Sequence, residues 1–216
     1  AFMYSAILIP FIPMFSSIRL GAEDCQRAAL IRLTGAYDGN NPENYLRNLG
    51  LVRPDESYQN ECTWHGMTCN CGRLQMIILA NIGTPRAWNL SWLPKTLIRI
   101  TAHRVSMRTH FPSRDLPPSL QQCSLVHCEL KGKNLNLKNL PADLRLLDLS
   151  SNYFEGTVFI AQLPANMTAL RLHSNRLMRA VGLREGLPGN IEVVIALQYN
   201  RSGNRLKLIG RDVEWI

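Results

Sequence analysis

Apolar residues recur along this chain at fixed distances from a series of prolines. Counted from Pro141, Leu144, Leu147 and Leu149 stand at offsets 3, 6 and 8, and Asn152 stands at offset 11. The same offsets select apolar residues after the other prolines of the series, which are 23 or 24 residues apart. These frames begin at Pro94, Pro117, Pro141, Pro164 and Pro188. A frame that returns so regularly indicates one structural unit that is repeated.

The centre of each frame predicts a β-strand. Side chains two positions apart on a strand lie on the same face, so the residues at offsets 6 and 8 form one buried face. One strand cannot bury that face alone, whereas stacked repeats form a continuous core and a parallel sheet. Weaker frames at residues 74–82 and after Pro188, where Val194 takes offset 6, bring the expectation to about six strands. The segments between the strands are short and mixed, which favours extended or 3₁₀ stretches over long helices.

The frame resembles the leucine-rich repeat, L-x-x-L-x-L-x-x-N/C-x-L. The resemblance implies an α/β fold, a leucine-rich repeat solenoid with about six repeats and a parallel concave sheet. Asn152 and Asn175 take the N/C position, where an amide can bond backbone groups that leave the sheet. Cys128 takes this position one repeat earlier. We expect Cys128 and the core-facing Cys123 to be buried free thiols.

The residues before the first repeat predict a cap for the open end of the solenoid. Residues 24–33 have helical spacing and an acidic start, and a C-x-W-x-G-x-x-C segment follows at residues 62–69. This segment resembles the closing motif of N-terminal caps in extracellular leucine-rich repeat proteins, such as plant receptor kinases and polygalacturonase inhibitors. The resemblance implies a disulfide-bonded helical cap, in which we favour Cys62–Cys69 and then Cys25–Cys71. Four cysteines allow three connectivities, so the pairing stays open.

A zinc site is the rival interpretation of this cysteine cluster. Cys62, His65, Cys69 and Cys71 could together offer three sulfur atoms and one nitrogen. The spacing is irregular for zinc, and the cap motif already accounts for the Trp-x-Gly context. We therefore expect no metal and no cofactor.

The two ends of the chain differ from its centre. Residues 2–18 carry no charge and contain two prolines, which favours a signal peptide over a membrane anchor. Without an initiator Met or a basic leader, the chain is expected to be an N-terminally incomplete fragment. The expected organisation is a signal peptide or anchor at 1–22, the cap at 23–71, the solenoid at 72–200 and a capping tail at 201–216. Because residues 193–197 are all apolar, we expect the tail to fold back over the last strand.

Charge and sequons bear on the partners and the localisation that the sequence predicts. The net charge is +8, but the basic residues are scattered, so nucleic acid is not an expected partner and most of them are interpreted as solvated surface. Three N-glycosylation sequons fit export, at Asn89, Asn166 and Asn200. The predicted localisation is secreted or cell-surface, with membrane association through the N-terminal apolar segment if that segment stays in place.

The chain shows none of the common catalytic motifs, so we do not expect an enzyme. Residues at offsets 5, 7, 9 and 10 point away from the core and form the predicted ligand-binding concave face. Its candidate residues are Arg99, Thr101, His103, Arg104, Gln122, Ser124, His127, Leu146, Asp148, Ser150, Arg171 and His173.

The predicted function is that of an exported or cell-surface leucine-rich repeat protein that recognises a protein ligand, with a glycan as a second choice of partner. That use of the concave face is an analogy with repeat families. The Leu-Pro-led repeats also resemble those of trypanosomatid surface proteins. Two alternatives stay open, namely the ectodomain of a receptor-like signalling protein and an inhibitor of a secreted hydrolase.

Overall fold

The computed structural model describes residues 22–36, 41–160, 162–183, 187–189, 191–194 and 206–209. The sequon at Asn200 and most of residues 1–22 and 201–216 therefore lie outside the described residues, so the expectations about them stay predictions. None of the helices in the described part of the chain has the length and apolar character that a membrane crossing requires.

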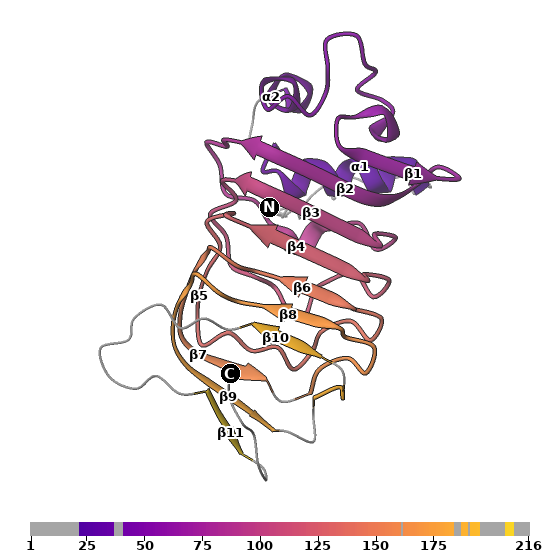
Figure 1. Cartoon of the computed structure of the whole chain (residues 1–216). Coiled ribbons are helices and arrows are strands. Elements are labelled where there is room, and N and C mark those ends of the chain that lie inside the picture. Colours follow the sequence, from indigo (N-terminus) through magenta and orange to yellow (C-terminus); the bar gives the residue numbers. More distant parts are fainter. Residues whose placement is uncertain are drawn as a thin grey trace, which may run out of the picture.

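The main sheet, sheet A, stacks one strand from each repeat on the next (Figure 1). Its six parallel strands match the expected number, and an antiparallel strand, β1, precedes them. This arrangement confirms the leucine-rich repeat solenoid. In their order in the sheet the strands are β1 (Met67–Asn70), β2 (Arg73–Ile82), β3 (Arg99–Val105), β4 (Gln122–Val126), β6 (Leu146–Asp148), β8 (Ala169–Arg171) and β10 (Glu192–Val194).

The prolines of the frame set the turn that leads into each strand. In all five frames the backbone N–H at offset 3 donates to the proline carbonyl, as Leu144 does to Pro141 at 3.0 Å. The fixed φ of proline suits such a turn, and its missing N–H is not needed there. The strand register then aligns the offset-6 residues of successive repeats. This central row is 0 % exposed and consists of Ile77, Ile100, Cys123, Leu147 and Leu170.

The last strand departs from the proline frame by one residue. Its register pairs Val193, not Val194, with Leu170, and Val193 packs against the core. The expected alignment of Val194, at offset 6, with Leu170 was therefore wrong. All residues from 193 to 197 are apolar, so the sequence pattern could not distinguish the two registers there.

The buried asparagines bond the backbone of two adjacent repeats at once. Asn152 Oδ1 accepts from the N–H groups of Cys128 and Leu130, both at 3.0 Å, and Asn152 Nδ2 donates to the carbonyls of Leu125 and Leu149. One repeat later, Asn175 Oδ1 accepts from the N–H of Phe154, and Asn175 Nδ2 donates to the carbonyls of Leu149 and Leu172. The predicted role of this position is confirmed.

A second parallel sheet, sheet B, lies along another side of the coil (Figure 1). The sequence predicted only extended or 3₁₀ segments here. In their order in the sheet its strands are β11 (Leu206–Ile209), β9 (Arg176–Leu183), β7 (Tyr153–Ile160) and β5 (Lys131–Lys133). The described part of the tail, β11, thus extends sheet B by pairing with β9. Coverage of β10 by the tail stays a prediction.

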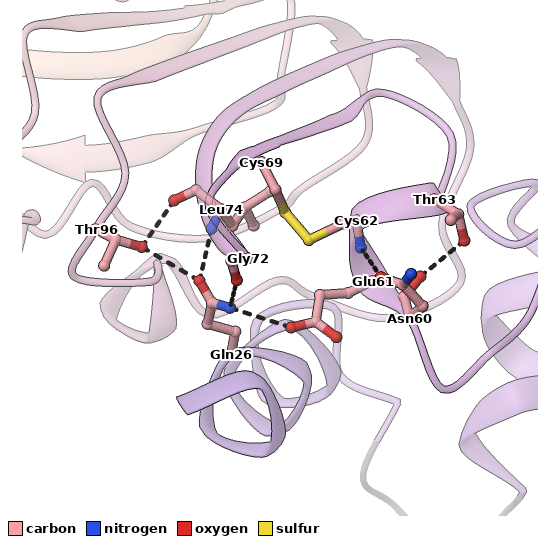
Figure 2. Close-up of a disulfide and its surroundings, with 9 residues drawn as sticks. All are labelled: Gln26, Asn60, Glu61, Cys62, Thr63, Cys69, Gly72, Leu74 and Thr96. Atoms are coloured by element: carbon pink, nitrogen blue, oxygen red, sulfur yellow. Dashed lines mark hydrogen bonds between the residues drawn. A yellow bond between two sulfur atoms is a disulfide. The ribbon is translucent and has the colours of Figure 1, made fainter. Parts of the chain in front are cut away.

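Helices precede the first repeat. They are α1 (Ala22–Leu33) and α2 (Pro42–Asn48), and two 3₁₀ turns, η1 (Glu61–Thr63) and η2 (Leu90–Trp92), follow them. Leu30 and Leu33 of α1 belong to the same buried cluster as the repeats. The buried Gln26 joins α1 to the sheet, because its side chain donates to Gly72 O at 2.8 Å and accepts from Leu74 N at 2.6 Å (Figure 2).

One disulfide forms among the described residues, between Cys62 of η1 and Cys69 of β1 (Figure 2). The expected second bridge between Cys25 and Cys71 was wrong for this structure, in which both are free and exposed. The two thiols have different surroundings: Cys25 lines a hollow beside Trp92, whereas Cys71 Sγ donates to Asn70 Oδ1 at 3.4 Å. Since two cysteines of the rival zinc set share the disulfide, that set does not form.

The four free cysteines predict a sharp contrast in thiol reactivity. Burial raises the pKa of Cys123 and raises that of Cys128 to about 11. Because the thiolate is the reactive form, we expect native protein to react with a thiol reagent at pH 8 through Cys25 and Cys71. Cys123 and Cys128 should react only after unfolding. Mass mapping of the labelled peptides checks this, and rapid labelling of Cys123 in native protein would contradict the buried placement.

The same pKa values give a pH dependence of stability. The folded state holds the two thiol protons more tightly than the unfolded state does. Their contribution to the free energy of unfolding is therefore complete below the usual thiol pKa of 9.0. The part due to Cys128 is lost progressively as the pH rises through about 11, and the part due to Cys123 is lost at still higher pH, since the unfolded chain releases these protons first.

Candidate functional site

The outer face of sheet A, which is the predicted concave face, carries side chains in regular rows. Strand register places each residue beside its counterpart in the next repeat, about 4.8 Å away. The first row runs Met76, Arg99, Gln122, Leu146, Ala169 and Glu192, and the second runs Ile78, Thr101, Ser124, Asp148, Arg171 and Val194. The structure therefore brings together the candidate residues at offsets 5 and 7.

The centre of this face is polar and carries small side chains. Thr101 and Ser124 are neighbours on β3 and β4 and are half-buried, so their hydroxyl groups line a shallow surface. At one end Ile78 is 48 % exposed. At the other end Arg171 Nη2 lies 3.1 Å from Glu192 Oε2 on the neighbouring strand. This face thus offers hydroxyl groups between an apolar end and an end that holds an ion pair.

Ser150 is not part of the open surface. It is only 2 % exposed, and its hydroxyl donates to Asp148 Oδ1 at 2.6 Å, so the expectation of a surface role was wrong. The Ser150 backbone N–H donates to the same oxygen at 3.0 Å. Asp148 therefore closes a local turn at the strand end, which is a common use of an aspartate side chain. The Asp148 carboxylate therefore accepts a backbone hydrogen bond in addition to lying on the outer face of the sheet.

Arg104 and His127 lie where the chain leaves β3 and β4 rather than on the open face of the sheet. Their φ angles are +55° and +54°, so the chain turns through the left-handed region at offset 10. Together with Tyr153 they line a separate hollow of about 270 Å³. His127 still contacts the face, because its ring meets that of His103 edge-on at a centroid distance of 5.7 Å.

His173 contributes a polar atom without a partner. Its Nδ1 is buried and has no hydrogen-bond partner among the described residues. Buried polar atoms of native proteins are nearly always satisfied by protein or water, so a ligand or a bound water is the natural partner. Strand offsets alone predicted where His173 lies, but no sequence signal marks the burial of one ring nitrogen.

No family model matches the sequence, and no curated protein matches it. A plant ice-binding protein has a similar structure, with a TM-score of 0.55 and 17% sequence identity over 81% of this chain. This chain spans 56% of the length of that protein.

Two receptor kinases are more distant in structure. One is a pollen receptor kinase 3, and the other is the leucine-rich repeat ectodomain of the receptor kinase SOBIR1 from Arabidopsis thaliana, each with a TM-score of 0.45 and 16% identity. The first covers 68% of this chain and the second 71%, and this chain covers 85% and 90% of them, respectively. At such identities a structural likeness shows the fold alone. The likeness to the ice-binding protein therefore establishes a shared fold, which in this chain is the leucine-rich repeat solenoid.

Proposed function

We propose that this protein is a recognition module whose outer sheet-A face binds a protein ligand. The observation that carries the proposal is the pair of aligned rows, which present polar side chains at a fixed strand spacing over several repeats. A sheet fixed by the buried core holds these side chains rigidly, so little ordering is needed when a partner binds. The proposed role is binding rather than catalysis.

Export to the cell surface or secretion belongs to this proposal. The Cys62–Cys69 disulfide fits an oxidising compartment. Asn89 and Asn166 are exposed, as an N-glycosylation acceptor must be. Glycopeptide mass spectrometry of protein made in a secretory host tests this, and unmodified asparagine at both positions would count against export.

A bulky charge at the centre of the face should weaken partner binding. Ser124 is half-buried between Thr101 and Asp148 in its row, so an arginine there would stand across the surface. With a binding partner isolated from a secreted-protein library, we expect Ser124→Arg to weaken binding at least tenfold. Surface plasmon resonance measures the dissociation constant.

Asn139→Arg is the matched control, because it adds the same charge at an exposed position outside sheet A. This variant should bind like the parent. If Ser124→Arg binds as tightly as the parent while both variants keep the parent's thermal midpoint, the partner uses another surface and the proposed face is wrong.

A further inference from the structure

A further hollow lies on sheet B, on a different face from the rows of sheet A. It has a volume of about 510 Å³ and draws its lining from four successive turns of the solenoid. We term it the lateral groove. Its side chains are those of His110, Lys131, Lys133, Tyr153, Glu155 and Arg176.

Strand register arranges these side chains in two short rows. In the first row Lys131 lies between His110 and Tyr153, its cross-strand neighbours. In the second row Glu155 lies between Lys133 and Arg176. Neighbours in each row are one strand apart, about 4.8 Å, so the groove presents functional groups at a short regular spacing.

The charges of the lateral groove do not cancel. Lys131, Lys133 and Arg176 are cationic, and Glu155 is the one carboxylate among the lining residues. Lys133 Nζ lies 3.7 Å from Glu155 Oε1, and both side chains are exposed. An exposed pair of this kind contributes little, so either member can exchange its partner for a ligand at small cost.

An exposed aromatic ring lies among these charges. Tyr153 is 45 % exposed, and the Arg176 guanidinium lies 5.1 Å from the centroid of its ring. Such a ring has an apolar body and a hydroxyl that can both donate and accept. The packing of sheet B does not require this exposed tyrosine. Other residues of the sheet, such as the buried Phe154, face the core.

We propose that the lateral groove binds an anionic saccharide, through carboxylate or sulfate groups carried on sugar rings. Lys131 and Arg176 would form charge-assisted hydrogen bonds with the anionic groups. Tyr153 would pack against the apolar side of a ring, and Glu155 would accept hydrogen bonds from sugar hydroxyls. Glu155 decides the class of ligand, because a carboxylate repels a bare polyanion but suits a molecule that carries hydroxyl donors as well as charge. The volume lies within the range of sites for small ligands.

The test uses the full chain and three tetrasaccharides of known composition, namely an alginate-derived uronate, a heparin-derived sulfated oligomer and neutral maltotetraose. Isothermal titration calorimetry gives each dissociation constant. At least one charged oligomer should bind ten or more times as tightly as maltotetraose, and the comparison of uronate with sulfate identifies the anionic group. The Lys131→Gln/Arg176→Gln and Tyr153→Ala variants should each weaken that binding at least tenfold.

The control variant is Lys95→Gln/Lys138→Gln, which removes the same charge from exposed positions outside the groove. It should keep the parent's affinity, and an equal loss would show that binding is merely electrostatic. Lysine acetylation of the parent chain gives a reading that needs no variant, since bound oligomer should protect Lys131 and Lys133 but not Lys138. The proposal is overturned if no oligomer binds at 1 mM, on the order of the weakest specific affinities. It is also overturned if poly-glutamate competes as well as the saccharide does.

Discussion

Replacement of Leu147 by aspartate is expected to abolish folding. Leu147 is fully buried in the central row, between Cys123 and Leu170. A carboxylate at this place would have no partner, and its burial would cost several kcal/mol of a total stability of about 5–15 kcal/mol. Far-UV circular dichroism and urea unfolding check the result. We expect the variant to show no cooperative transition at 25 °C.

Asp148→Ala is the control for this variant, one residue along the same strand. The sequence pattern alone placed Asp148 on the concave face, where a substitution usually changes stability by about 0.5 kcal/mol or less. The structure raises the expected loss to about 1 kcal/mol, because the carboxylate bonds the backbone and hydroxyl of Ser150. Similar unfolding midpoints for the two variants would mean that the strand register is wrong.

Gly66→Ala is expected to have the second largest effect. Gly66 has a φ of +77°, and an added Cβ would lie 2.1 Å from the carbonyl oxygen of Ile78. The backbone cannot move aside without loss of the 2.7 Å hydrogen bond from Ile78 N to Gly66 O. We expect a loss of about 3 kcal/mol or more, the sum of left-handed strain and the clash. Urea unfolding monitored by tryptophan fluorescence measures it.

The chain contains a matched control for this prediction. Gly50 has a φ of +72°, and an added Cβ there would meet nothing within 4 Å. Gly50→Ala should therefore lose only the left-handed strain, about 1–2 kcal/mol. The difference between the two variants isolates the steric clash, and equal losses would refute the close approach of Gly66 to β2.

The repeats could be predicted from the sequence because the same frame recurs several times. The positions of Leu147 and Asn152, offsets 6 and 11, have similar packing and bonding requirements in successive repeats. Each repeat is therefore further evidence for the same frame. The glycine of the C-x-W-x-G-x-x-C segment was visible as a motif. The reason that glycine is required there, which is the close approach of Gly66 to the Ile78 carbonyl, is visible only in the structure.

Features that occur once or lie outside the frame were not predictable in the same way. The strands of sheet B include segments with no regular alternation of apolar and polar residues, such as β5, Lys131-Gly132-Lys133. The pairing of these strands depends on the geometry of the whole coil. Ser150 is buried by a local bond to Asp148 that strand alternation cannot reveal. The register shift at Val193 falls in a run without polar residues, so the sequence offered no choice between its faces.

The buried asparagines also give the solenoid a direction. Asn152 supplies the acceptor for Cys128 N and Leu130 N, and Asn175 supplies the acceptor for Phe154 N. The repeats that carry Cys128 and Phe154 are therefore each completed by the repeat that follows in the chain. During synthesis these amides would stay bonded to water, and the repeat could not bury them, until roughly 25 further residues had left the ribosome, which at about 5–20 residues per second takes a few seconds.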